Sequence, residues 1–314
     1  AMSTNVALIY GGKSQEREIS LRTGEQVTSA LLEKGFEVIA LDLDEDIATT
    51  LLHAKPDVVF IALHGKYGED GCIQGLLEIL GLPYVGSGVL ASALAMNKAI
   101  SKQLFRLEGL MCPKDVLFSS RMLRKAGIQN LVARAERDIP LPLVVKPNKQ
   151  GSTIGLTVVE SPRDLEKAIL KAFEYDDEVL VEEYISGTEI TVGVLGNDEL
   201  RALPVIEIRS VKGLYDYEAK YTPGMSEHII PAEIDESAYK AAQEAALKAH
   251  RALGCRGISR SDLIVTSENQ VYILEVNTIP GMTRTSLIPD AAKAAGIEFP
   301  DLIASLVELA LEET

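Results

Sequence analysis

Short apolar runs that alternate with segments of helical periodicity constrain the fold more than any other feature of this sequence. Residues 6–10, 36–43 and 57–63 are such runs, and each is short enough to be a buried strand. Between the first two runs, apolar and small side chains recur at helical spacing from Ile19 to Leu31. Strands that alternate with helices predict a parallel sheet with helices on both faces, so this part of the chain is expected to be an α/β domain.

Two polar residues stand where such a sheet binds ligands. Glu16 and His64 follow the first and third runs, and ligands of open α/β sheets bind beyond the carboxyl ends of the strands. A structural role would explain both residues as well, because the helix dipole favours an acidic side chain at a helix start and a histidine can simply end a strand. The residues alone leave the two interpretations open.

The pattern changes in the second part of the chain. Residues 143–147 and 157–159 flank a loop with glycines, which predicts an antiparallel hairpin. Further strands are expected at 178–184, 190–195, 203–208, 262–266 and 270–276, and helices at 90–106, 164–173 and 239–253. The chain as a whole is therefore expected to combine an α/β part with an α+β part.

The charge balance excludes some partners. Lys and Arg number 31 and Asp and Glu number 46, so the net charge of −15 argues against a nucleic acid or an anionic membrane as the partner. No apolar run reaches the roughly 20 residues that span a bilayer, and no secretory signal is expected. Cys72, Cys112 and Cys255 lack metal-site spacing, so reduced thiols in the cytoplasm are expected.

A lysine and a glycine-containing loop follow the first strand of the expected hairpin. Lys146 ends that strand, and Gly151, Ser152 and Gly155 lie in the loop. Loop amides can hold phosphate oxygens and a lysine adds a positive charge, so the segment suits a nucleotide. The order of a Walker loop is absent, and an ordinary hairpin turn beside a lysine is the alternative.

Acidic residues mark the end of the strand expected at 178–184. Glu182, Glu183 and Ile185 lie where the strand runs into irregular backbone, whose carbonyl and amide groups can pair with adenine. Glu189 could accept hydrogen bonds from ribose hydroxyls. The alternative interpretation is that these acidic side chains have no ligand and are simply solvated at the edge of the protein.

The last two expected strands carry oxygen ligands. Glu275 and Asn277 alternate along one strand and so share a face, and Asp262 joins them if the two strands pair. Two carboxylates and an amide oxygen suit Mg²⁺ that bridges phosphates. The alternative is a carboxylate pair solvated by water, although an unpaired Glu275 would be costly in so apolar a run.

A long polar stretch with aromatic residues runs from residue 210 to residue 231. A structureless loop of this length would be surprising in a compact domain unless it closed over a ligand, so a lid is expected at about 206–226. Lys220 and Tyr221 lie within it.

Taken together, these segments resemble the ATP-grasp superfamily and, within it, the D-alanine–D-alanine ligase family. The resemblance covers nearly the whole chain and is carried, in this order, by residues 11–20, 62–65, 68–71, 146–147 with 151–155, 215–221 and 275–286. It implies an N-terminal α/β domain at 2–97, followed by two domains at 98–184 and 185–314 that clamp ATP. The implied activity is ATP-dependent formation of D-alanyl-D-alanine through an acyl phosphate, for peptidoglycan precursor synthesis, by a homodimer.

The same resemblance implies roles for individual residues. For ATP, it implies Lys98 and Lys146 at the α- and β-phosphates under the loop 151–155, Lys220 at the γ-phosphate, Glu182, Glu183 and Ile185 at adenine, and Glu189 at the ribose. For the metal, it implies two Mg²⁺ ions, which Mn²⁺ could replace, on Asp262, Glu275 and Asn277. For the first amino acid, it implies Glu16 at the ammonium, in one hydrogen-bonded set with Ser152 and Tyr221, and His64 as a further substrate contact. For the second amino acid, it implies Ser286 and Leu287 at the carboxylate. It also implies that Arg260 and the Gly281 amide stabilise the oxyanion.

Three other functions can be weighed against this one. In ligation of D-alanine to D-lactate, the same resemblance implies phenylalanine in place of Tyr221. A non-catalytic ATP-binding module would need fewer metal ligands than this sequence offers. A dinucleotide-dependent oxidoreductase is disfavoured, because the turn after the first strand lacks the Gly-x-Gly-x-x-Gly order.

Overall fold

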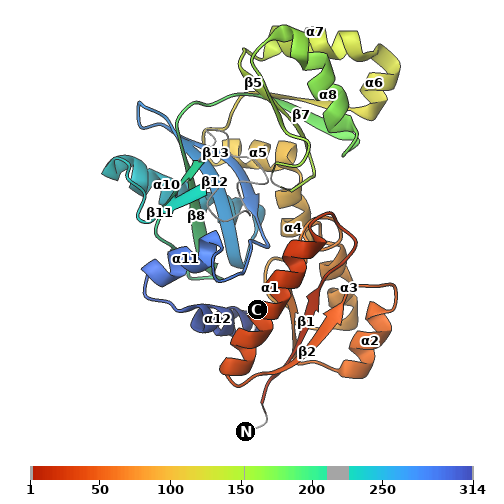
Figure 1. Cartoon of the computed structure of the whole chain (residues 1–314), viewed down its shortest axis with the longest axis vertical. Helices are drawn as coiled ribbons and strands as arrows, with labels where there is room; N and C mark the ends of the chain where they lie inside the picture. The colour runs from red at the N-terminus through yellow and green to blue at the C-terminus, as the bar shows by residue number, and fades with distance from the viewer. Residues whose placement is uncertain (1–2, 152, 211–225, 313–314) are drawn as a thin grey trace.

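The computed structural model describes residues 3–151, 153–210 and 226–312, and it contains three sheets with helices packed around them (Figure 1). The first sheet is parallel, in the order β2-β1-β3. Its strands are β1 (Asn5–Tyr10), β2 (Glu37–Asp42) and β3 (Val58–Ile61). The expected parallel sheet is confirmed.

Helices cover both faces of this sheet, as the alternation predicts. Val6 and Leu8 pack with α1 (Arg17–Glu33) and α12 (Phe299–Leu311), whereas Ala7 and Ile9 pack with α2 (Ile47–Ala54) and α3 (Cys72–Leu80). Successive side chains of a strand point to opposite faces, which explains why neighbours in β1 join different clusters. The C-terminal helix thus returns to the N-terminal sheet and packs against α1 (Figure 1).

The expectation of a single helix at 90–106 is wrong. The structure has two helices, α4 (Val89–Met96) and α5 (Lys98–Leu107), and Asn97 between them has an extended ψ of 95°. The Asn97 side chain accepts a hydrogen bond from the amide of Ile100 at 3.1 Å, so it caps the second helix. This cap ends one helix and starts another within a continuous apolar pattern.

The second sheet is antiparallel, in the order β4-β7-β5-β6. Its strands are β4 (Asp115–Ser119), β5 (Leu143–Pro147), β6 (Thr157–Val159) and β7 (Glu178–Glu183). The hairpin of β5 and β6 is confirmed by the pairing of Val144 with Val158. Three helices, α6 (Ser120–Ala126), α7 (Ile128–Asp138) and α8 (Leu165–Phe173), gather at this sheet, with a 3₁₀ turn at Pro162–Asp164 before the last (Figure 1).

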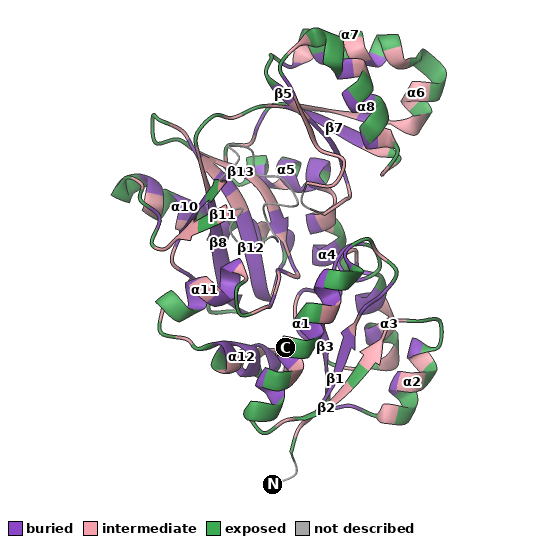
Figure 2. Cartoon of the chain, viewed as in Figure 1, coloured by how far each residue is buried: buried purple, intermediate pink, exposed green. Residues whose placement is uncertain are grey.

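The third sheet has the order β11-β10-β8-β12-β13, with β9 beside β8. Its strands are β8 (Thr188–Gly196), β9 (Arg201–Ala202), β10 (Ile206–Ser210), β11 (Ser226–Ile229), β12 (Gly257–Val265) and β13 (Val271–Asn277). Helices α4, α5 and α10 (Glu236–Leu253) share an apolar cluster with it, and α11 (Leu287–Ala294) contacts β8. Figure 2 shows the strands as mostly buried and the outward helix faces as exposed.

Two strand expectations in this sheet need correction. The strand expected at 203–208 begins only at Ile206, because Pro204 has no amide hydrogen to continue a ladder. The strand expected at 262–266 begins at Gly257, so Arg260 and Asp262 lie within β12 rather than ahead of it. The small polar residues at its start are held by pairing with β8, from Gly257 to Val265.

Three further observations bear on the sequence-based expectations. The cysteines Cys72, Cys112 and Cys255 are all free. Among the described residues, no helix has the length and apolar character that would carry it across a membrane. Of the lid expected at 206–226, only 206–210 and Ser226 belong to the described residues, and they lie in β10 and β11.

Candidate active site

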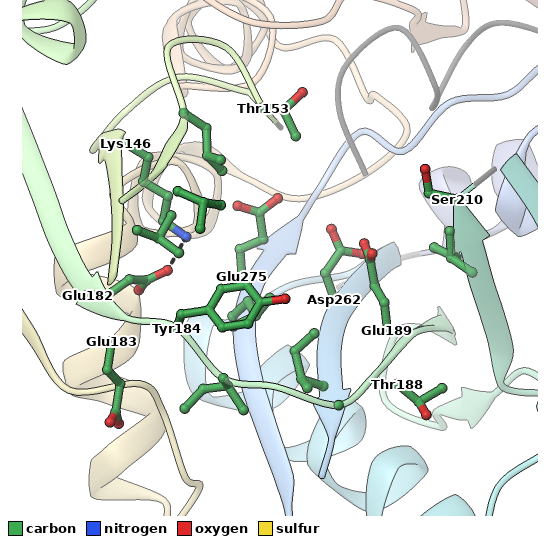
Figure 3. Close-up of a pocket in the computed structure, with 18 of the residues that line it drawn as sticks. Lys146, Thr153, Glu182, Glu183, Tyr184, Thr188, Glu189, Ser210, Asp262 and Glu275 are labelled. Atoms are coloured by element: carbon green, nitrogen blue, oxygen red, sulfur yellow. Dashed lines mark ion pairs between the residues drawn. The ribbon is translucent and has the colours of Figure 1, made fainter. Parts of the chain in front are cut away.

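A cleft with a volume of about 470 Å³ lies between the second and third sheets. Lys146 and Glu182 line it from the second sheet, Tyr184 lines it from the segment after β7, and Asp262 and Glu275 line it from the third sheet (Figure 3). Residues that are more than a hundred positions apart in the sequence therefore face one shared cavity. The lysine and the oxygen ligands that the sequence singled out converge on the same space.

Two lysines hold a buried glutamate at the second-sheet side of this cleft. The ammonium of Lys146 lies 2.5 Å from the carboxylate of Glu182, and the ammonium of Lys102 lies 2.7 Å from the same carboxylate. Lys102 is also 2.7 Å from Asp115. Burial by itself would raise the pKa of Glu182, but the charges of Lys146 and Lys102 lower it to about 2.

Lys146 stays charged in this cluster. Burial lowers the pKa of its ammonium, but the carboxylates of Glu182 and Glu275 outweigh that effect and raise it above its usual value. The ion cluster therefore fixes a cation at the cleft wall, where the sequence predicts a phosphate.

The end of β7 forms the rim of the cleft. Ile185 and Glu189 line the cavity, and the Glu189 carboxylate lies beside Asp262 (Figure 3). The Glu183 side chain points away and accepts a hydrogen bond from the amide of Lys114 at 2.9 Å. Any contact of Glu183 with a nucleotide base would therefore involve its backbone. The Glu182 carboxylate lines the cleft and has lone pairs left beside its two lysine contacts, so it can accept a further hydrogen bond.

The oxygen ligands of the third sheet share one face, as predicted. Asp262 is the cross-strand partner of Glu275, and Arg260 is the partner of Asn277. Arg260 donates to both carboxylate oxygens of Asp262, at 3.0 and 3.1 Å. The Thr191 hydroxyl of β8 lies 2.9 Å from Asp262 Oδ1 and 3.0 Å from the carbonyl oxygen of Ser261, so its single proton is shared between these two acceptors and helps to orient the carboxylate.

This oxygen cluster fits a divalent cation only with help from a ligand. Among the described residues, no group of three or more His, Cys, Asp or Glu side chains could hold a metal ion. Two carboxylates and the amide oxygen of Asn277 are hard oxygen donors, and Mg²⁺ usually takes one or two protein carboxylates together with substrate phosphates. The donor set therefore suits Mg²⁺ brought by a nucleotide better than a metal bound by the protein alone.

Lys98 joins this cluster to the glycine loop. Its ammonium donates to the carbonyl of Gln150 at 2.5 Å and lies 3.6 Å from the carboxylate of Glu275. A Cβ added to Gly151 would lie only 2.9 Å from Glu16 Oε2, so the loop passes directly over the Glu16 carboxylate. Glu16 itself is buried and immediately precedes α1, and His64 is buried after β3.

A second cavity of about 90 Å³ lies beside Arg260. Gly281, Ser286 and Leu287 line it together with Arg260, so the structure brings together the residues predicted for the second carboxylate and the oxyanion. Ser286 precedes the first turn of α11, where backbone amides point outward and favour an anion. The sequence interpretation did not single out His228, which also lines this cavity and lies 3.4 Å from Asp290.

Three predicted site residues, Ser152, Lys220 and Tyr221, lie outside the described residues. Three other residues, to which the sequence analysis gave no role, lie in the site, namely Lys102, Thr191 and Glu69. Lys102 could have been found, because it follows Lys98 by four positions on one helix and therefore lies on the same side. Thr191 had no signal, because its role depends on the pairing of β8 with β12.

The two antiparallel sheets, the cleft between them and its facing lysines and carboxylates define an ATP-grasp enzyme. A family model described as "D-ala D-ala ligase C-terminus" matches residues 104–308, and one described as "D-ala D-ala ligase N-terminus" matches residues 43–87. The chain belongs to the D-alanine–D-alanine ligase family.

Individual relatives agree over the full length. The D-alanine–D-alanine ligase of Pelotomaculum thermopropionicum is 52% identical over 311 residues, which cover 99% of this chain and 98% of the relative. That of Desulforamulus reducens is 50% identical over 313 residues, with 99% and 100% covered.

Solved structures agree as well. The Bacillus anthracis D-alanine–D-alanine ligase complexed with ATP superposes with a TM-score of 0.83 at 33% identity, with 98% of each chain covered. The VanG D-Ala:D-Ser ligase of Enterococcus faecalis superposes with a TM-score of 0.84 at 35% identity, with 99% of this chain and 100% of that one covered.

Proposed function

We propose that this protein uses ATP to join two D-alanine molecules into D-alanyl-D-alanine, releasing ADP and phosphate, as a step in peptidoglycan precursor synthesis. Family membership over the full chain supports the reaction. The observation that carries the proposal is the shared cleft, where Lys146 on one wall faces Asp262 and Glu275 on the other. This arrangement combines cations for a polyphosphate with oxygen ligands for the metal that accompanies it.

The first half-reaction makes a leaving group. A carboxylate does not react with an amine in water, because hydroxide would have to leave. In the proposed step a carboxylate oxygen of the first D-alanine attacks the γ-phosphorus of ATP in line, ADP departs, and an acyl phosphate forms. Lys98 and Lys146 would offset negative charge on the α- and β-phosphates, with the loop 151–155 above them and Lys220 at the γ-phosphate.

The second half-reaction forms the peptide bond. The neutral amine of the second D-alanine attacks the acyl carbon, phosphate leaves with the electrons of the broken C–O bond, and the nitrogen gives up one proton to the departing phosphate. Ser286 and Leu287 at the start of α11 would bind the second carboxylate. Arg260 and the Gly281 amide would stabilise the oxyanion. A guanidinium has five N–H donors, so Arg260 can pair with Asp262 and still serve this role.

The nucleotide base and the metal ions have proposed places in the same cleft. Adenine would contact Glu182, Glu183 and Ile185, and Glu189 would accept from the ribose. Asp262, Glu275 and Asn277 would hold two Mg²⁺ ions, or Mn²⁺ in their place. When bound, these ions would neutralise charge that develops on the transferred phosphoryl group.

The first amino acid would bind on the N-terminal side of the cleft. Glu16 would hold its ammonium, in one hydrogen-bonded set with Ser152 and Tyr221, and His64 would be a further contact.

We also propose that the protein is a homodimer in the cytoplasm, where ATP is available and its three cysteines stay reduced.

The proposed reaction can be tested by measuring ADP and phosphate release with ATP and Mg²⁺ against a panel of D- and L-amino acids. Turnover with D-alanine and a dipeptide product of the expected mass are expected. Turnover confined to L-amino acids would contradict the substrate assignment. Nucleotide binding without any turnover would instead favour a non-catalytic ATP-binding module.

The choice of the second substrate can be tested at Tyr221. One structural neighbour is a D-Ala:D-Ser ligase, so the panel includes D-serine as well as D-lactate. We expect Tyr221→Phe to admit some ester product when D-alanine and D-lactate compete, because the resemblance links tyrosine there to an amine nucleophile. Mass spectrometry measures the product ratio, and a ratio unchanged from the parent protein would remove this role from Tyr221.

A further inference from the structure

Glu69 is a buried carboxyl group that no step above uses. It lies in the connection between β3 and α3, and its side chain is only 7% exposed. Its Oε2 accepts a hydrogen bond from the amide of Gly65 at 2.5 Å. A Cβ added to Gly65 would lie 3.0 Å from Glu16 Oε2. Gly65 therefore lies between two carboxyl groups, one from Glu69 and one from Glu16.

Glu69 faces a small cavity at the centre of the site. The cavity has a volume of about 30 Å³ and is lined by Glu69, Lys98, Gly151, Glu275 and Asn277 among others. One water molecule needs roughly 10 to 15 Å³ measured in this way, so the space suits one or two groups of that size. An ammonium group is about as large as a water molecule. Gly151 also contacts Glu16, which brings the cavity next to the proposed ammonium site.

The surroundings make an ionised Glu69 costly while the site is empty. Burial raises the pKa of Glu69 to about 8, and the negative charge of Glu16 acts in the same direction. The Gly65 amide and the charges of Arg260 and Lys98 oppose this rise without cancelling it. Glu275 of β13 lines the same cavity as Glu69.

From this geometry we propose that Glu69 is a second carboxyl group of the site that binds the ammonium of the first amino acid, opposite Glu16. The proposal rests on the proposed function, because it takes an α-amino acid as the ligand. An arriving ammonium adds the positive charge that two neighbouring carboxyl groups need if both are to ionise. Glu69 then releases its proton to solvent, and the ammonium is held by two carboxylates rather than one.

Isothermal titration calorimetry can count this proton. D-alanine is titrated into the protein free of nucleotide and divalent metal, the state to which the raised pKa of Glu69 applies, in buffers of different ionisation enthalpy at pH 7. Because burial raises the pKa of Glu69 to about 8, its carboxyl group is mostly protonated at pH 7. We therefore expect the parent protein to release nearly one proton per chain more than Glu69→Gln does.

The pH dependence of D-alanine affinity provides an independent readout. Raising the pH removes the proton from Glu69 in the empty protein, so binding no longer has to expel it. The dissociation constant of the parent protein should fall as pH rises from 6 to 8, by up to about tenfold per pH unit. For Glu69→Gln it should stay nearly constant over this range. A role limited to holding Gly65 would not change this slope, because glutamine also accepts that hydrogen bond.

Two further variants serve as controls. Glu69→Asp keeps a carboxyl group and should retain proton release, even if its affinity is lower. Glu78→Gln makes the same charge change on the exposed side of α3 and should behave as the parent protein does. Thermal unfolding checks that each variant is folded, and Glu69→Asp decides the question if Glu69→Gln does not fold.

Equal proton release by the parent protein and Glu69→Gln would overturn the inference, and so would a parent protein that releases no proton. These results differ from a failure of the proposed function. If the parent protein makes D-alanyl-D-alanine while the proton counts agree, only the role of Glu69 is lost. If it neither binds D-alanine nor makes the dipeptide, the proposed function itself is wrong.

Discussion

The charged groups on the two walls of the cleft differ in their burial and in the distances to their partners. On the second-sheet wall, the Glu182 carboxylate is 3% exposed, and two lysines lie 2.5 and 2.7 Å from it. On the third-sheet wall, the carboxylates of Asp262 and Glu275 are 17% and 16% exposed and lie on paired strands. Their cations lie farther away, at 3.0 Å for Arg260 and 3.6 Å for Lys98.

This difference separates a structural charge cluster from one that is ready to bind. Buried charges are stable only when they are closely paired, so the second-sheet wall is complete without a ligand. The partly exposed carboxylates of the third-sheet wall can exchange their present contacts for a metal ion at a smaller cost. We infer that the second-sheet wall holds its shape throughout the reaction. The third-sheet wall changes its contacts when nucleotide and metal bind.

The largest expected effect comes from breaking the buried cluster. Lys102→Met removes one partner of Glu182 and Asp115 in a position that is fully buried. The remaining buried charge should reduce the free energy of unfolding by about 3 to 5 kcal/mol, as measured by urea denaturation. Lys167→Met, on the exposed side of α8, is the matched control and should change it by less than about 0.5 kcal/mol. Similar stability of the two variants would mean that this wall is not a closed structural unit.

The next effect tests the opposite wall. Asp262→Asn removes the negative charge beside the buried Arg260 but keeps an oxygen that can accept from Arg260 and Thr191, so we expect a smaller fall in melting temperature than for Lys102→Met. The rate of ADP release at saturating substrates should fall by about 100- to 1,000-fold. Glu268→Gln, in the turn that joins the same two strands, is the matched control and should retain activity. A large loss of stability in Asp262→Asn without a loss of activity would reverse the comparison.

The smallest expected effect sharpens the comparison between the two walls. Thr191→Val removes the hydroxyl that donates to Asp262 at 2.9 Å while keeping the shape of the side chain. Loss of one hydrogen bond to a charged group should lower the rate of ADP release by roughly tenfold, with about 1 to 2 kcal/mol lost from the free energy of unfolding. Thr157→Val is the control, because the Thr157 hydroxyl has no hydrogen-bond partner in the described part of the chain. An unchanged rate in Thr191→Val would show that Asp262 needs no orientation by β8.

Periodicity along the chain predicted a large part of the fold. Continuous apolar runs such as β1, alternating with segments of helical spacing such as α1, indicated a parallel sheet with two covered faces, because a strand that is buried on both faces is apolar throughout. The hairpin of β5 and β6 was also readable. The break at Asn97 was not, since a single capping side chain interrupted an otherwise continuous helical pattern.

The candidate site, like the fold, could be predicted only in part from the sequence. Glu275 and Asn277 could be placed on one face from spacing alone, and the resemblance supplied their partners. That Asp262 lies directly opposite Glu275 depends on the register between β12 and β13. The burial of Lys102 and the position of Glu69 beside Glu16 depend on contacts between segments far apart in the chain, which spacing does not contain.

The sequence by itself determined which residue types and which local elements this protein has, because strand and helix periodicities and short motifs are properties of neighbouring residues. Only the tertiary structure decided which of these charged groups meet and which are buried. Burial and distance determine whether a carboxyl group is ionised and what it can bind, and both depend on how β5, β7, α5 and β12 pack together. The same residue type therefore became a structural ion partner at Glu182 and a candidate ligand at Glu275.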